Sequence, residues 1–157
     1  MQPTLACGSG SNVRGMVWLD TDGNGQRVAS EVGRGGVTVQ LLQGTTIIAT
    51  TTTTAATGQY NFLDVAPGTY SVRVVPPSGM VVSPQGQGGD PTLDSDVDPG
   101  TGQSVPFTVV IGKDNTIDAG LFQGVCVGVC VGVCTRLCLY VCVMAATAVG
   151  LTYVLYQ

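Results

Sequence analysis

Apolar and polar side chains alternate along most of the chain, and this period of two constrains the fold more than any other feature of the sequence. The alternation occurs in short runs separated by turns rich in Gly, Pro, Asn and Asp, as expected for strands and their connections. We expect strands over residues 13–19, 37–42, 47–54, 59–63, 69–75, 104–110 and 116–121. A long acidic, glycine-rich loop separates the fifth from the sixth. About seven strands in about 110 residues predict an all-β, immunoglobulin-like β-sandwich.

The same alternation predicts which side chains form the core. In each run one face carries the large apolar residues, so that face is expected to point between the two sheets. The predicted inward residues are Val37, Val39, Leu41, Tyr60, Phe62, Tyr70, Val72 and Val74. We interpret the aromatic residues among them as packing residues and not as a sugar-binding platform.

Composition excludes several classes of function. Charged residues make up 10% of the chain, the formal net charge is −4, and histidine is absent. Six basic residues are too few for the positive surface that nucleic-acid binding requires. Without histidine, the commonest general base and zinc ligand is missing. A glycosidase would need one carboxylate in apolar surroundings, whereas the clustered carboxylates here lie in glycine-rich loops. We therefore expect no enzymatic activity.

The chain divides into three parts. Residues 1–11 are small, polar and rich in Gly and Ser, as in a leader or linker, and they show no secretory signal peptide, since both a basic and an apolar region are missing. Residues 12–122 contain the alternating pattern and all ten carboxylates. Residues 123–157 form a hydrophobic tail rich in Val, Cys and Gly with a single charge, Arg136.

An acidic loop follows the first predicted strand. Residues 20–31 match the twelve-residue calcium loop D-x-[DN]-x-[DN]-G-x5-E at every defined position. Calcium prefers six to eight oxygen ligands, and alternate loop positions present them from one side, while Gly25 allows the sharp turn. The predicted ligands are Asp20, Asp22, Asn24, the backbone carbonyl of Gln26, and Glu31. The alternative is an ordinary solvated Asp-Gly turn.

A second acidic cluster lies in the long loop. It comprises Asp90, Asp94, Asp96 and Asp98, and four carboxylates so close in sequence repel one another unless a cation lies among them. We expect calcium here as well, either at a second site or with these side chains completing the first. The alternative is a solvated run of charge. For Asp118, in the last predicted strand, a ligand role and simple exposure to water are equally compatible with the sequence.

Several stretches together resemble one known family, the SdrD B-like domain, which is related to the collagen-adhesin (Cna) B-type repeats. They are GMVWLD at 15–20, DGNG at 22–25, GVTVQL at 36–41, GQYNF at 58–62, PGTYSV at 67–72, DSD at 94–96 and IDAGL at 117–121. The resemblance covers residues 12 to 122 in the right order.

The resemblance implies a Cna B-type β-sandwich that serves as a stalk or spacer outside the cell, in bacterial cell-surface adhesins. It supports Asp20, Asp22, Asn24, Gln26 and Glu31 as calcium-loop positions and Asp94 and Asp96 as further ligands. Some related repeats carry a Lys–Asn isopeptide bond formed from a strand lysine. The only lysine here is Lys113, in a predicted turn, so we do not expect that cross-link.

The tail allows two interpretations. Residues 137–156 are uncharged and long enough for a transmembrane helix, and Gly124, Gly128 and Gly132 have the spacing of closely packed membrane helices. This predicts a C-terminal membrane anchor. However, the repeat GVCVGVCVGVC also resembles a translated simple-sequence repeat, that is, a non-physiological extension. Five cysteines, each four residues from the next and without histidine, do not match a zinc site.

These observations together predict a non-enzymatic, calcium-binding, extracellular structural or spacer module of a cell-surface or adhesin-type protein. The expected partners are calcium and neighbouring modules or surface-protein ligands, with no nucleic acid, and the tail adds the option of membrane insertion. The alternative function is a carbohydrate- or protein-binding module appended to a larger secreted protein.

Overall fold

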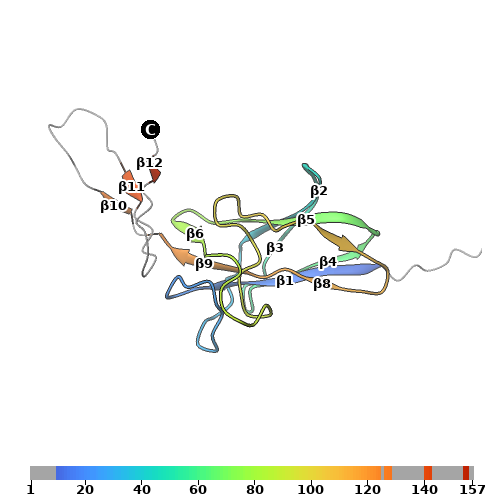
Figure 1. Cartoon of the computed structure of the whole chain (residues 1–157), viewed down its shortest axis with the longest axis horizontal. Coiled ribbons are helices and arrows are strands. Elements are labelled where there is room, and N and C mark those ends of the chain that lie inside the picture. Colours follow the sequence, from blue (N-terminus) through green and yellow to red (C-terminus); the bar gives the residue numbers. More distant parts are fainter. Residues whose placement is uncertain (1–9, 125, 129–139, 143–153, 156–157) are drawn as a thin grey trace, which may run out of the picture.

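Two β-sheets pack face to face in the computed structural model, which describes residues 10–124, 126–128, 140–142 and 154–155 (Figure 1). The first sheet has the order β4-β1-β9-β6, from β1 (Ser11–Leu19), β4 (Gln59–Val65), β6 (Met80–Val82) and β9 (Ala119–Gln123), and β8 (Asn115–Thr116) also pairs with β1. The second sheet has the order β3-β2-β5-β7, from β2 (Thr38–Gln43), β3 (Thr46–Thr52), β5 (Gly68–Val75) and β7 (Phe107–Val109). The predicted all-β sandwich is confirmed.

The predicted strand over residues 104–110 is shortened to β7, and beyond such shifts at strand ends the strands differ from the predicted ones in two places. β6 lies inside the segment that was expected to be a loop; three residues after Gly79 are too short a run for alternation to reveal, and they pair with β9. The last predicted strand is divided into β8 and β9, because the ladder with β1 is interrupted at Ile117 and Asp118. The sandwich therefore has nine strands in the described residues rather than about seven.

The described parts of the tail form a separate small sheet. It contains β10 (Cys126–Gly128), β11 (Tyr140–Cys142) and β12 (Val154–Leu155), paired antiparallel in that order. No helix among the described residues has the length and hydropathy of a membrane span. The remainder of the predicted anchor, and residues 1–9 of the predicted leader, lie outside the described residues.

The core lies between the sheets and contains the side chains that the alternation predicts. Val39 and Leu41 of β2 face Tyr60 and Phe62 of β4, all with at most 6% of their surface exposed. The rings of Tyr60 and Phe62 meet edge to face, with their centroids 5.8 Å apart. Trp18 is also fully buried, although alternation along β1 directs it to the outer face of the first sheet. Loops therefore cover part of that face.

Tyr60, a core residue of β4, stabilises the break between β8 and β9. Its hydroxyl donates a hydrogen bond of 2.6 Å to the carbonyl of Ile117. Gly15 of β1 lies directly opposite, and a Cβ atom at that position would lie 1.8 Å from the same carbonyl oxygen. A side chain at position 15 would therefore push the two strands apart. The tyrosine hydroxyl and the glycine together fix where β8 ends and β9 begins.

We predict that Tyr60→Phe lowers the free energy of unfolding by about 1–2 kcal/mol, because the half-buried carbonyl of Ile117 loses its hydrogen-bond donor. Urea unfolding followed by the fluorescence of Trp18, the single tryptophan of the chain, measures the change. Tyr70→Phe is the matched control, because the Tyr70 ring is buried but its hydroxyl makes no hydrogen bond within the described residues. Equal effects of the two substitutions would contradict the assigned role of Tyr60.

Candidate metal centre

Asp20 begins the acidic loop at the end of β1, and its carboxylate is surrounded by backbone donors. Oδ1 accepts hydrogen bonds from the N–H groups of Gly23 (2.8 Å) and Asn24 (3.3 Å), and Oδ2 accepts one from Gly25 (2.8 Å). Gly25 has a φ of +79°, in the left-handed region, and a Cβ there would lie 2.2 Å from the carbonyl oxygen of Pro84. The turn therefore requires glycine at this position, as the calcium-loop pattern predicts.

Glu31 closes the loop by folding back onto its first residues. Oε1 accepts the backbone N–H of Thr21 at 2.7 Å, and Oε2 accepts the N–H of Val28 at 3.1 Å. Carboxylate oxygens of Asp20, Asp22 and Glu31 lie within 4.8 Å of one another. Residues eleven positions apart in sequence thus form one group of three carboxylates, two of them buried.

The other predicted ligands of this loop lie beside the group. The side chain of Asn24 donates to Asp22 (2.7 Å) and accepts the backbone N–H of Gln26 (2.6 Å). Gln26 is exposed and forms a backbone bridge with Asp94 of the long loop. These contacts place all five predicted loop positions within one compact turn.

Within the described residues, the three carboxylates form no ion pair with any lysine or arginine, since Arg14–Asp114 is the one ion pair found there. Burial raises the pKa of Asp20, but hydrogen bonding to its carboxylate, which includes the N–H groups of Gly25 and Gly23, lowers it by more, so the pKa lies below its usual value. Asp20 is therefore negatively charged at neutral pH although its side chain is 1% exposed. Buried negative charge without a basic partner attracts a cation.

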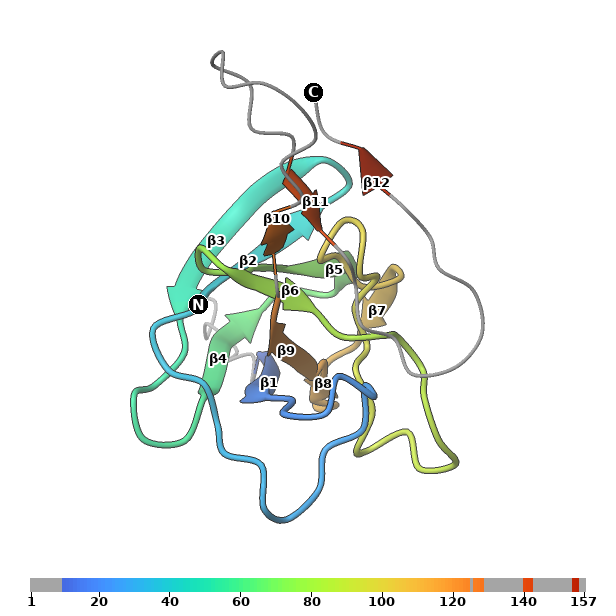
Figure 2. The same cartoon turned by 90° about the vertical axis from the view of Figure 1, so that its left-hand side faces the viewer.

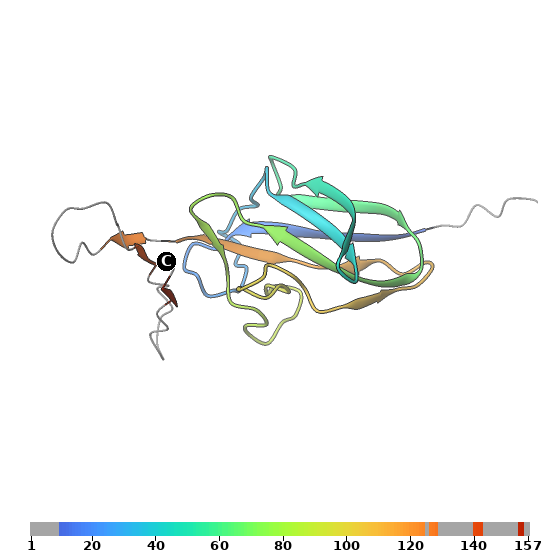
Figure 3. The same cartoon turned by 90° about the horizontal axis from the view of Figure 1, so that it is seen from above.

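The long loop, residues 83–106, is held against the acidic loop by backbone hydrogen bonds. Ser95 donates to the carbonyl of Gly25 (3.0 Å), and Arg27 donates to the carbonyl of Leu93 (2.6 Å). The two loops lie side by side on one side of the first sheet (Figure 3). The acidic loop therefore positions the segment that carries Asp94 and Asp96.

The second acidic cluster is divided by the fold. Asp90 and Asp98 are exposed and hold local turns, by accepting hydrogen bonds from Thr92 and Thr101. Asp96 instead faces Asp118, whose N–H donates to Asp96 Oδ2 at 2.6 Å, while Asp96 N–H donates to the carbonyl of Asp118 at 2.8 Å. Asp94 and Asp96 thus lie beside Asp118 and outside the group formed by Asp20, Asp22 and Glu31.

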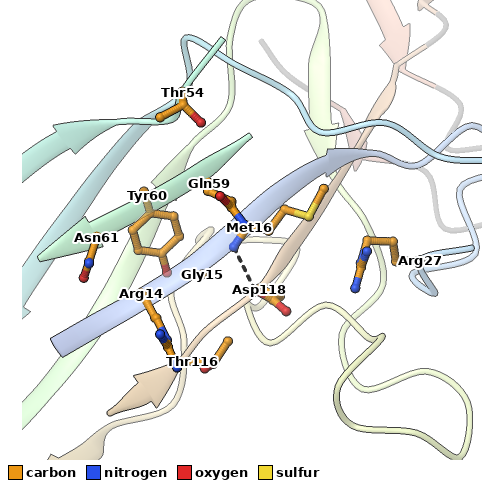
Figure 4. A pocket seen from close by; sticks show the side chains of 10 residues that line it. All are labelled: Arg14, Gly15, Met16, Arg27, Thr54, Gln59, Tyr60, Asn61, Thr116 and Asp118. Carbon is orange, nitrogen blue, oxygen red and sulfur yellow. Dashed lines mark hydrogen bonds between the residues drawn. The ribbon is translucent and has the colours of Figure 1, made fainter. Parts of the chain in front are cut away.

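Asp118 occupies the gap between β8 and β9. Its Oδ1 accepts the N–H of Met16 at 2.7 Å, so the side chain replaces the missing ladder hydrogen bond (Figure 4). The carboxylate lines an open groove of about 620 Å³ over β1, β4 and β8, and Arg27 reaches this groove from the acidic loop. Burial raises the pKa of Asp118, which the N–H of Met16 and the charge of Arg27 oppose.

Arg27 was not among the residues predicted from the sequence. It occupies a non-ligand position of the acidic loop, and no local pattern relates it to Asp118, which lies far along the chain. Arg27 lowers the pKa of Asp118 only because the two loops dock onto the sheet and bring it close to that carboxylate. Only the tertiary structure reveals this docking.

Comparison with known proteins agrees with this architecture. The family model described as the SdrD B-like domain matches residues 11–121. The chain belongs to the SdrD B-like domain family. It is 36% identical over 113 residues to the serine-aspartate repeat-containing protein F of Staphylococcus epidermidis, covering 71% of this chain and 7% of that protein. It is 35% identical over 113 residues to the serine-aspartate repeat-containing protein D of Staphylococcus aureus, covering 71% of this chain and 8% of that protein. The chain thus spans less than a tenth of the length of these relatives.

We predict that the cation-free SdrD B-like domain loses stability as the pH rises from about 4 to about 7, and that Asp96→Asn removes part of this loss. Burial, with repulsion from Asp118 and Asp94, raises the pKa of Asp96 from 3.8 to about 6. The folded state therefore binds a proton more readily than the unfolded chain, and the resulting stabilisation is present at pH below 4 and lost as the pH passes 6. For a partly buried group the difference amounts to about 1–2 kcal/mol.

Urea unfolding of the full chain in excess EDTA, at intervals between pH 4 and 7.5, measures this dependence. Asp64→Asn is the matched control, because Asp64 is an exposed carboxylate at which asparagine suits the local φ of +53°. A pH dependence in Asp96→Asn identical to that of the unsubstituted chain would refute the prediction.

Proposed function

We propose that this chain carries a non-catalytic, calcium-binding structural module of an extracellular surface protein. The observation that carries the proposal is the group of three carboxylates from Asp20, Asp22 and Glu31, closed by the turn at Gly25 and lacking a basic partner within the described residues. All its donors are oxygen atoms, which hard cations prefer, and the loop has the length and glycine position of a calcium loop. The donor set therefore fits calcium.

The role of the ion in this proposal is to join two loops to the sheet. Asp20 N–H donates to the carbonyl of Leu121 in β9, so the carboxylate group begins at the hydrogen-bonded ladder itself. Gly25 and Arg27 in turn hold the long loop through their backbone groups. An ion that fixes the acidic loop thereby also fixes the docking of the long loop on the first sheet.

We propose Asp94 and Asp96 as ligands of the same class of cation, near Asp118. Three carboxylates converge here with Arg27 as the nearby positive charge, and the Oδ1 atom of Asp94 is buried without a hydrogen-bond donor. Burial and, after it, repulsion from Asp118 and Asp94 raise the pKa of Asp96, and a divalent cation at this point would offset both effects. It would join the long loop directly to the gap between β8 and β9.

The course of the chain supports the spacer role. β1 begins at one end of the sandwich and β9 ends at the other, so the chain enters and leaves at opposite ends (Figure 1). A module of this form extends a polypeptide when it is placed in series with others. We propose that residues 12–122 are this module, that the natural setting is the cell surface, and that its neighbours are further modules of a longer protein, since the matched relatives are far longer than this chain.

Calcium is expected to stabilise the full chain against unfolding. At a free concentration of about 100 times the dissociation constant, a single site raises the free energy of unfolding by about 2.7 kcal/mol, and the melting temperature rises by roughly 10 °C. Thermal melts in EDTA, in calcium and in magnesium, followed by the fluorescence of Trp18, measure the shift. Magnesium should shift it less, because it requires a smaller and more regular site.

Substitutions distinguish calcium binding by the acidic loop from calcium binding by Asp94 and Asp96. Asp20→Asn and Glu31→Gln should abolish most of the calcium shift, whereas Asp64→Asn should keep it. Asp96→Asn should lower the shift only partly, if Asp96 serves a second site. A calcium shift that survives both Asp20→Asn and Glu31→Gln would show that the loop is an ordinary turn.

A further inference from the structure

We propose that the carboxylate of Asp20 protects two chemically labile bonds of the acidic loop, and that Asn24 deamidates spontaneously when this protection is lost. Asp22-Gly23 and Asn24-Gly25 are the single Asp-Gly pair and the single Asn-Gly pair of the chain. Both lie in the loop that follows β1, at the end of the sandwich that faces the viewer in Figure 2. The proposal concerns the loop without an ion and does not depend on calcium binding.

The reaction at Asn24 needs no enzyme and no reactant other than water. The backbone nitrogen of Gly25 loses its proton to a solvent base and attacks Cγ of Asn24, which forms a new C–N bond. The Cγ–Nδ2 bond breaks, and the side-chain nitrogen takes up a proton and leaves as ammonia, so that a five-membered succinimide ring remains. Water then opens the ring at one of its two carbonyls. Opening at Cγ gives aspartate, and opening at the backbone carbonyl carbon gives isoaspartate.

The residue that follows decides how readily this ring forms. Glycine has no Cβ to shield its nitrogen, and its backbone adopts the conformations that the attack requires. At Asp22 the nitrogen of Gly23 attacks in the same way and expels water instead of ammonia, so that the ring again opens to aspartate or isoaspartate. The other three asparagines, Asn12, Asn61 and Asn115, are followed by valine, phenylalanine and threonine. Their larger neighbours hinder the attack, so these residues serve as internal references.

The two carboxylate oxygens of Asp20 each bind one of the attacking nitrogens. Oδ1 accepts the N–H of Gly23 and Oδ2 accepts the N–H of Gly25, both at 2.8 Å. Gly25 is buried, and the side chain of Asp20 is 1% exposed. A solvent base therefore cannot reach the N–H of Gly25 while this hydrogen bond is in place. Removal of its proton requires the loop to open first.

The side chain of Asn24, which contains the carbon that is attacked, is held as well. Its Nδ2 donates to Asp22 Oδ2 at 2.7 Å, and its Oδ1 accepts the N–H of Gln26 at 2.6 Å. The amide therefore keeps one orientation, and any rotation breaks at least one of these hydrogen bonds. A fixed side chain and an inaccessible nitrogen together slow the reaction in the closed loop.

Either product would change the loop permanently. In isoaspartate the main chain runs through Cβ and Cγ, so the backbone just before Gly25 gains one CH2 group. Gly25 fits tightly, since a Cβ there would lie 2.2 Å from the carbonyl oxygen of Pro84, and added length would displace its N–H from Asp20. Opening to aspartate would instead replace the donor to Asp22 with a further negative charge. Deamidation of Asn24 therefore weakens the closed form of the loop.

Peptide mapping of the full chain measures both reactions. The chain is incubated in mildly alkaline buffer with EDTA, a reductant and a neutral detergent, either folded or unfolded in concentrated urea. Trypsin releases residues 15–27, which contain both pairs. Mass spectrometry detects the replacement of NH2 by OH, and chromatography separates the isoaspartate peptides. Asn24 should react at least about tenfold more slowly in the folded chain, and Asn12, Asn61 and Asn115 should stay unchanged in both. Equal rates at Asn24 in the folded and unfolded chain would overturn the proposal.

Two matched substitutions test whether Asp20 is the protecting group. Asp20→Asn removes the carboxylate that binds both glycine N–H groups, and it should accelerate deamidation of Asn24 in the folded chain by about tenfold or more. Glu31→Gln removes the same charge from the same group, but Glu31 binds the N–H groups of Thr21 and Val28, so it should raise the rate far less. Near-UV circular dichroism verifies that both variants are folded. Equal rates in the two variants would assign the protection elsewhere and overturn the role of Asp20.

Amide hydrogen exchange of the unsubstituted chain supplies a test that needs no variant to fold. The N–H groups of Gly23 and Gly25 should exchange at least about tenfold more slowly than that of Gly89, an exposed glycine of the long loop. Exchange at Gly25 as fast as at Gly89 would show that Asp20 does not protect this nitrogen, and would overturn the proposal.

Discussion

The position of Asp20 connects the core of this domain to its candidate metal centre. Its backbone N–H extends the ladder between β1 and β9, by donating to Leu121 at 2.9 Å. Its carboxylate accepts three N–H groups of the following turn and lies beside Asp22 and Glu31. Asp20 therefore connects the end of β1 to the acidic group. Because it is anchored on the sheet side, the loop cannot rearrange without disturbing the strands beneath it.

A second set of charges follows from this anchoring. Through Gly25 and Arg27 the acidic loop holds the long loop, and the long loop brings Asp94 and Asp96 to Asp118. Here the fold buries Asp96 and Asp118 beside other carboxylates, and burial, with the neighbouring charge, raises the pKa of both. Such an arrangement costs stability unless a proton or a cation compensates for the charge. In the proposed role, a cation from the surroundings binds these carboxylates and removes this loss of stability. This is the physical basis for proposing that the domain works outside the cell.

Much of the fold follows from local sequence. Alternation predicted β1 to β5 to within two residues at their ends, and it predicted the inward residues, because a strand buried on one face must repeat with period two. β6 and the division between β8 and β9 were not predicted. β6 has only three residues, and the division depends on Tyr60 and Gly15, which belong to other strands. Signals of this kind are absent from any local window of the sequence.

The sequence by itself determined the sandwich, its core and the acidic loop from Asp20 to Glu31, because these features depend on residues within one strand or one turn. The tertiary structure alone decided that Asp96 lies against Asp118 and that Arg27 reaches the same groove. These two outcomes depend on which strands and loops become neighbours. Strand order is set by the packing of the whole chain, so residues a hundred positions apart come into contact without any local pattern that relates them.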